Sequence, residues 1–168
     1  MSTETEGTGM GTKATEQHAW LHRLVGTWNV TSEMHLGPDE PPMTGTGTEK
    51  VTMLGDLWAY VEGEGTMPNG ETMKYKSAIG YDVTFNEYRG CWFASVSSHL
   101  WKYHGSLSSD GNTLTLNCEG PHMQKDNATA NYRDVIEFIN ETTRTLTSYG
   151  QDDDGNWHQF MRSTLTRV

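Results

Sequence analysis

Turn-forming residues divide this chain into short segments of alternating polar and apolar residues. Tight turns are expected at residues 68–70, 109–112 and 153–156, because Asn-Gly and Asp-Gly pairs favour the backbone angles of tight hairpins. Alternation with a period of two is typical of strands that bury one face. We therefore expect strands at residues 27–34, 47–54, 57–65, 72–81, 88–96, 99–107, 114–118, 132–140, 144–150 and 157–167.

Only residues 16–24 show helical periodicity. Trp20, Leu21 and Leu24 fall on one face at i, i+3, i+4 spacing, and Gly26 follows as a C-terminal cap. No helix connects the expected strands, which excludes a doubly wound fold. A meander of this length closes more readily than it stays open with two unpaired edges. The sequence therefore predicts an all-β fold: a single antiparallel up-and-down β-barrel of about ten strands with a short N-terminal helix.

Composition limits the classes of partner. The chain has 168 residues, of which 22 are acidic and 12 basic, so its formal net charge is −10. This balance argues against nucleic acid or an anionic membrane surface as a partner, because both are bound through clustered Lys and Arg. The sequence has no apolar run of about 18 residues, which a membrane-spanning helix would need.

The chain is expected to form one domain. Residues 1–15 are rich in Thr, Glu and Gly and have no apolar stretch, so they predict a disordered lead and no secretory signal. Residues 16–168 then form the barrel domain. Without an export signal we expect a cytoplasmic protein, in which Cys91 and Cys118 stay reduced.

The residues that open the chain resemble a known family. The run from Glu16 to Trp28 is similar to the opening of a bacterial family catalogued as domain of unknown function 1579. The resemblance continues through Gly80-Tyr81-Asp82, Tyr88, Trp92, Gly105, Gly120 and residues 158–167. That family resembles the calycins, which include lipocalins, fatty-acid-binding proteins and haem-binding nitrobindins. The resemblance implies a calycin-like barrel and leaves the activity unassigned.

One segment departs from the family. An acidic residue is expected soon after Trp92, and residues 93–96 contain none. This difference argues against transferring a carboxylate inside the cavity from the family.

The resemblance also implies how the barrel closes. Trp28 would lie at the closed end, with Arg167 from the last strand across it. A guanidinium over an indole ring gains cation–π attraction, and its donors can reach unpaired backbone carbonyls. Arg167 has the same parity as Met161 and Leu165 in the last segment, as well as Trp157 and Gln159. We interpret the Trp28–Arg167 pair as structural.

Several aromatic residues share parity with the apolar residues of their segments. Such rings combine an apolar body with a polar tip, which suits a cavity for an amphipathic ligand. The alternative is that the same rings fill the barrel completely. Ala59 and Val61 compete with Tyr60 for the interior, and Leu100 competes with Trp101. The expected ligand-binding residues are Tyr60, Tyr75, Trp92, His99, Trp101 and Tyr103.

No metal site is expected. His18 and His22 lie four residues apart, as in some zinc sites, but the Glu of such motifs is missing, so we expect a surface or lid pair. Residues 152–156 resemble the start of a calcium loop without its closing carboxylate, so we expect a polar turn. An inward His99 leaves a haem-binding barrel as an alternative. Phosphate-binding loops and nucleophile motifs are absent from the sequence.

The leading hypothesis is therefore non-enzymatic binding of a small apolar or amphipathic molecule inside the barrel, with no cofactor. The first alternative is a haem-binding or metal-dependent barrel that uses an inward histidine. The second is a filled barrel that acts through its surface or through self-association, and a homodimer is left open.

Overall fold

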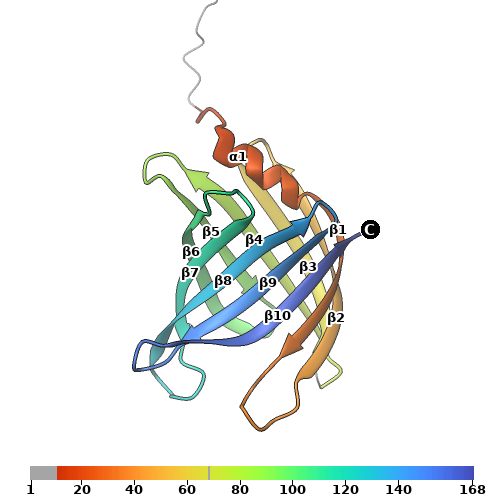
Figure 1. Ribbon diagram of the computed structural model, residues 1–168, viewed down its shortest axis with the longest axis vertical. Helices are drawn as coiled ribbons and strands as arrows, with labels where there is room; N and C mark the ends of the chain where they lie inside the picture. The colour runs from red at the N-terminus through yellow and green to blue at the C-terminus, as the bar shows by residue number, and fades with distance from the viewer. Residues whose placement is uncertain (1–10, 68) are drawn as a thin grey trace, which may run out of the picture.

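Ten antiparallel strands form one closed barrel in the computed structural model, which describes residues 11–67 and 69–168 (Figure 1). Each strand pairs with the next along the chain, and β1 also pairs with β10. Residues 1–10 of the expected disordered lead lie outside the described residues. The elements are α1 (Glu16–Leu21), η1 (His22–Leu24), β1 (Gly26–Met34), β2 (Met43–Leu54), β3 (Trp58–Thr66), β4 (Thr72–Asp82), β5 (Glu87–Ala94), β6 (Ser97–Leu107), β7 (Thr113–Pro121), β8 (Thr129–Asn140), β9 (Thr143–Gln151) and β10 (Trp157–Arg167). The predicted all-β, up-and-down barrel of about ten strands with a short N-terminal helix is confirmed.

The helical segment lies across one end of the barrel (Figure 1). The Trp20 side chain is buried and packs edge-to-face against Phe138 at 5.8 Å between ring centroids. Its Nε1 donates a hydrogen bond to the carbonyl of Gly111, in the turn between β6 and β7, over 2.7 Å. The short helix therefore covers the barrel end through its apolar face, as its periodicity predicts.

Of the two expectations for His18 and His22, a surface pair or a lid pair, the surface position is wrong for His18, which lies within the helical segment that covers the barrel end. Its side chain is 1% exposed, and its Nδ1 lies 3.0 Å from the backbone nitrogen of Thr15. Its ring packs edge-to-face against Tyr81. The first turn of α1 is closed against the barrel, so His18 is enclosed there while His22 remains exposed.

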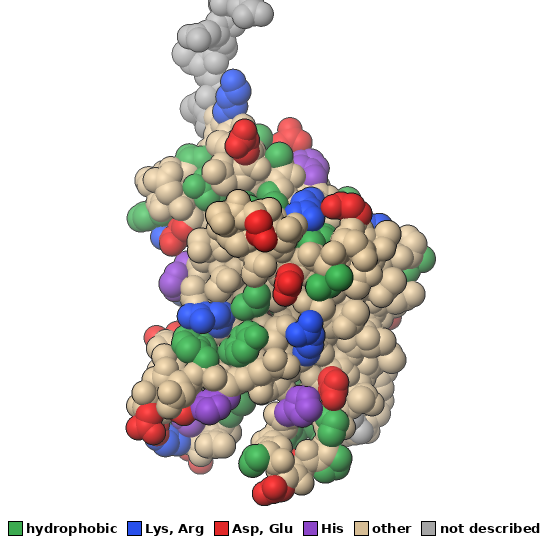
Figure 2. Space-filling view, viewed as in Figure 1, with side chains coloured by type: hydrophobic (Ala, Val, Ile, Leu, Met, Phe, Trp, Pro, Cys, Tyr) green, Lys and Arg blue, Asp and Glu red, His purple; other side chains and the backbone are tan. Residues whose placement is uncertain are grey.

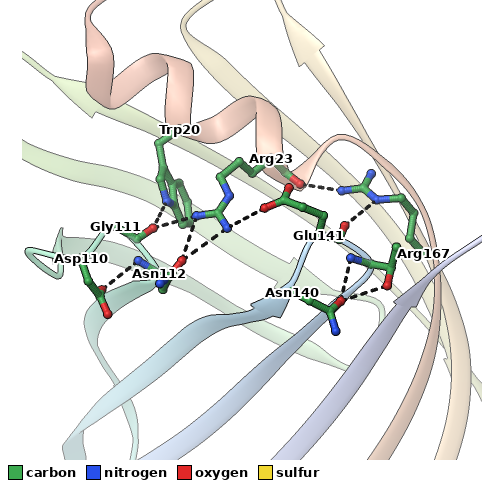
Figure 3. Close-up of polar contacts among 9 residues, drawn as sticks. Trp20, Arg23, Asp110, Gly111, Asn112, Asn140, Glu141 and Arg167 are labelled. Atoms are coloured by element: carbon green, nitrogen blue, oxygen red, sulfur yellow. Dashed lines mark hydrogen bonds and ion pairs between the residues drawn. The ribbon is translucent and has the colours of Figure 1, made fainter.

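The closure of the barrel centres on Trp28, which is fully buried. Its Nε1 donates to the carbonyl of Leu24 over 2.9 Å, and the Arg167 guanidinium lies 4.2 Å from the ring centroid. Arg167 also donates to the backbone carbonyls of Val25, Arg23 and Glu141, as Figure 3 shows for the latter two. The structure thus has the expected Trp28–Arg167 pair, and it links η1, β1, β10 and the β8–β9 turn.

Gly26 makes this arrangement possible. Its φ angle of 142° is one that side chains disfavour, and a Cβ there would lie 2.5 Å from Nη1 of Arg167. A larger residue would displace the guanidinium from the carbonyls that it caps.

A β-bulge in β10 changes the expected parity. The register shifts between Gln159 and Met161, so Phe160 packs against the core and Gln159 is exposed. Trp157 therefore lies on the outer face, where the Arg133 guanidinium stacks 4.1 Å from its ring centroid. The expectation that Trp157 and Gln159 share a face with Arg167 is wrong, because one extra residue reverses the alternation.

We predict that Trp28→Ala lowers the free energy of unfolding by roughly 3–5 kcal/mol, the usual cost of truncating a core Trp or Phe. Urea denaturation provides the measurement. Trp58→Ala is the matched control, since Trp58 is 40% exposed on the outer face. Equal losses in the two variants would contradict a special role for Trp28.

Candidate functional site

The barrel is packed at one end and open at the other. Inward side chains near α1, such as Leu114, Leu116 and Tyr88, are at most 1% exposed. At the opposite end the inward side chains are partly exposed, and Figure 2 shows the surface hollowed there, between the loop after β1 and the loops after β7 and β9. We call this open end the mouth, defined by Met34, Met43, Met73, Trp92, Phe160 and Met161.

Part of the mouth wall is bare backbone. Gly45 on β2 and Gly65 on β3 occupy inward positions in the alternation of their strands. Within 4 Å, a Cβ at Gly45 would meet only the Thr66 carbonyl oxygen, and a Cβ at Gly65 would meet only backbone atoms of β2. No side chain lies within 4 Å of these two Cβ positions, so the inner face of the wall is bare backbone here.

A buried ion pair lies farther inside. Glu49 on β2 is 7% exposed and Arg144 on β9 is 3% exposed. Nη2 of Arg144 contacts Oε1 of Glu49, and Tyr75 donates to Oε2 of Glu49 over 2.8 Å. Burial, reinforced by the charge of Glu49, raises the pKa of Tyr75, so the phenol stays a neutral donor. Arg144 also lies 4.5 Å from the ring centroid of Trp28 and connects this network to the closed end.

A second polar network is centred on Asp134 of β8. Ser148 donates to its carboxylate over 2.6 Å, and Tyr103 donates to the other carboxylate oxygen. Burial raises the pKa of Asp134, and these two hydrogen bonds partly offset the rise. Burial and the nearby Asp134 raise the pKa of Cys118 to about 12. The thiol is therefore protonated near neutral pH and is a poor nucleophile.

Sequence reasoning missed Glu49, Arg144 and Asp134. Each has the parity of inward apolar neighbours, as Asp134 does with Ile136 and Glu49 with Val51. A charged residue at an inward position was the available signal. The segment after Trp92 supplies no carboxylate, as its sequence shows, and the acids of the interior come from β2 and β8 instead.

Four of the expected aromatic residues face the interior. Tyr75 and Trp92 are neighbours, with ring centroids 5.7 Å apart, and Trp101 lies 5.0 Å from Tyr132. Tyr103 is buried beside Asp134. The structure thus brings Tyr75 and Trp92 together near the mouth, while Trp101 and Tyr103 lie along β6.

The expectation that Tyr60 faces the interior is wrong. Ala59 and Val61 are buried, and Tyr60 lies on the outer face with Lys76, whose Nζ is 2.8 Å from the phenol oxygen. Both faces of this strand carry apolar or aromatic residues, so the alternation alone could not decide which face is inward. The smaller Ala59 and Val61 point into the packed end of the barrel, and Tyr60 lies outside against Lys76.

His99 belongs to β6, and its side chain reaches the neighbouring strand β7. Its Nε2 is 2.9 Å from the carbonyl oxygen of Glu119, and its ring packs edge-to-face against Trp101 at 4.8 Å. Among the described residues no three His, Cys, Asp or Glu side chains are grouped closely enough to hold a metal ion. Nε2 of His99 is thus engaged with Glu119.

Residues 152–156 form a polar hairpin turn, as expected. Oδ1 of Asp152 accepts hydrogen bonds from the backbone nitrogens of Asp154 and Asn156, at 3.0 and 2.8 Å. Oδ2 lies 2.7 Å from Nε2 of His158. The carboxylate oxygens of Asp152 therefore organise the turn.

The fold is a closed ten-stranded up-and-down barrel, and the chain belongs to the family of proteins of unknown function DUF1579, whose model matches residues 13–167. It is similar to Rv2717c from M. tuberculosis, with a TM-score of 0.64 and 11% identity over 93% of this chain and 99% of that one. It is also similar to the S-type phycobiliprotein lyase CPES from Guillardia theta, with a TM-score of 0.59 and 16% identity over 89% and 91% of the two chains. These likenesses concern the fold. No curated protein matches the sequence.

Within residues 11–67 and 69–168, no helix is long and apolar enough to cross a bilayer. Cys91 and Cys118 are both free thiols.

We predict that Asp134→Asn changes the pH dependence of stability. The folded-state pKa of Asp134 is raised above 3.8, so its contribution to stability is largest at low pH and is lost as the pH rises through that pKa. The free energy of unfolding of the variant relative to the wild type should therefore increase between about pH 4 and about pH 8. Urea titrations across this range measure the difference. A difference that is constant or falls with pH would contradict the buried, destabilised carboxylate.

Proposed function

We propose that the protein binds a small apolar or amphipathic molecule in the mouth half of the barrel and does not transform it. The observation that carries this proposal is the bare wall at Gly45 and Gly65, beside partly exposed apolar side chains such as Met43 and Met73. A barrel interior that served only as a core would be filled with side chains at these positions, as it is beneath α1.

The lining of the mouth supports a ligand with a sizeable apolar part. Met34 on β1 is paired across the strands with Met43 on β2 and Met161 on β10. Methionine side chains are flexible and polarizable, so they adapt to irregular apolar shapes. Tyr75 and Trp92 add flat aromatic surface on β4 and β5.

The two polar networks provide hydrogen-bonding groups beside the apolar lining, and an amphipathic ligand needs both kinds of surface. Glu49 and Asp134 carry acceptors inside the barrel, while Nε of Arg144 is buried without a hydrogen-bond partner. Because an unpaired buried donor is unfavourable, a ligand oxygen or an ordered water at Arg144 would be stabilising.

The two alternatives have less support. A haem bound through Nε2 of His99 would require this nitrogen to give up its contact with Glu119. A filled barrel that acts through its surface does not explain the uncovered glycine positions. A cytoplasmic location and a homodimer stay predictions, as does the non-enzymatic role.

We predict that the neutral fluorescent probe N-phenyl-1-naphthylamine binds saturably with one site per chain. Trp92→Ala should weaken binding by about tenfold, because it removes aromatic surface from the mouth wall. Tyr60→Ala is the matched control and should leave the affinity unchanged, since Tyr60 lies outside the barrel. Fluorescence titration gives the dissociation constants. Absence of saturable binding, or equal effects of the two variants, would overturn the proposal.

A second prediction tests the bare wall directly. Gly65→Leu places a side chain in the uncovered space, and its Cβ would be 3.4 Å from the nearest atom, an ordinary contact. The variant should fold, as circular dichroism can show, and should weaken probe binding by about tenfold or more. Glu64→Leu adds the same side chain on the outer face and serves as the control. Unchanged binding by a folded Gly65→Leu protein would place the ligand elsewhere.

Mass spectrometry of an organic extract of the purified protein would identify a natural ligand.

A further inference from the structure

The ladder between β6 and β7 is incomplete. These strands pair only from His104 opposite Asn117 to Leu107 opposite Leu114. The same register would place Lys102 opposite Glu119 and so continue toward the mouth, but no backbone pairs form there. β7 and β8 pair along the whole of β7. The barrel wall is therefore open along this seam on the mouth side.

Two rings cross the seam in place of backbone hydrogen bonds. His99 on β6 contacts the carbonyl oxygen of Glu119 on β7. Trp101 lies against Gly120, where a Cβ would be 2.2 Å from Cζ3 of the indole. The strands thus keep their register through side chains, which can move more easily than a ladder of backbone hydrogen bonds.

A cavity of about 530 Å³ occupies the seam. Its lining combines residues from both faces of the wall. Lys102, His104 and Asn117 lie on the outer face, whereas Cys118 and Tyr132 are inward and buried. The cavity thus opens on the outer surface and extends as far as two residues of the inner face.

Two basic side chains lie at the outer side of this cavity. Lys102 and the exposed His104 line it on β6, and the Arg133 guanidinium on β8 stands beside the lining, where it donates to Asn117 over 3.1 Å and stacks on Trp157. Glu119 is the one carboxylate in the lining. In a chain with a net charge of −10, such a grouping creates a local preference for anions. On the inner side the lining includes Tyr132, whose ring packs edge-to-face against Trp101.

We propose that the β6–β7 seam is a binding site for an anionic amphiphile, and that it is also a side entrance to the barrel. The head group would lie between Lys102 and His104, and the apolar part would pass beneath His99 and Trp101 toward the mouth. This inference rests on the proposed function, because the apolar part must have an interior to enter.

The first experiment compares amphiphiles that share a chain of twelve carbons and differ in charge. Laurate, 1-dodecanol and dodecyltrimethylammonium compete with N-phenyl-1-naphthylamine. Laurate should displace the probe at about tenfold lower concentration than the cation, and its advantage should shrink with added salt. The double variant Lys102→Gln/His104→Gln should weaken laurate about fivefold and leave the neutral probe unchanged. Lys50→Gln, a charge removal on the outer face of β2, is the control.

The second experiment measures entry by stopped-flow fluorescence. His99→Ala removes the contact with Glu119 and should raise the association rate of the probe by about fivefold. His158→Ala, at an exposed histidine of β10, should leave the rate unchanged.

The outcomes separate this inference from the proposed function. Failure of the probe to bind the wild type would remove both. Probe binding with no preference for laurate, or with no effect of the double variant, would overturn the head-group site. An unchanged or slower rate in His99→Ala would overturn the side entrance. Either of the last two results leaves a barrel that is filled through its mouth.

Discussion

The architecture depends on the contact between Trp28 and Arg167. β1 and β10 come from opposite ends of the described barrel domain, and their pairing begins at this contact. The indole closes the barrel from inside, and the guanidinium satisfies carbonyls that η1 and the β8–β9 turn would otherwise leave unpaired. One pair of side chains therefore fixes the helix over the barrel end and completes the sheet.

The closed end and the mouth of the barrel differ in how they are packed, so stability and an accessible interior come from different parts of the molecule. Apolar packing beneath α1 supplies stability, so the mouth can remain underpacked and polar groups can be buried farther inside. The Glu49–Arg144 pair illustrates the cost of such a core, because two charges must be held away from water. It is tolerated here because Tyr75 and the ring of Trp28 provide additional partners.

Alternation, turn residues and one helical periodicity were sufficient to predict the barrel and its helix, and the family resemblance implied the Trp28–Arg167 pair. The alternation was misleading in β3, where both faces carry apolar residues and Tyr60 was assigned to the wrong one. It was also misleading at Trp157, because the bulge between Gln159 and Met161 reverses the alternation within β10. Glu49, Arg144 and Asp134 were missed because a charged residue in a strand is normally assigned to the outer face. The β6–β7 seam could not be predicted either, since the alternation continues through both strands after their backbones separate.

The β1–β10 pairing has a consequence for synthesis of the chain. Because β10 comes last, a nascent barrel has two unpaired edges until β10 is available, and it cannot close by local hairpins alone. Contacts between residues so distant in sequence form slowly, and open strand edges favour association with other chains. The interval between translation of β1 and docking of β10 is thus the period in which the protein is most exposed to aggregation. The helix that covers the barrel end would gain its full support only when Arg167 arrives.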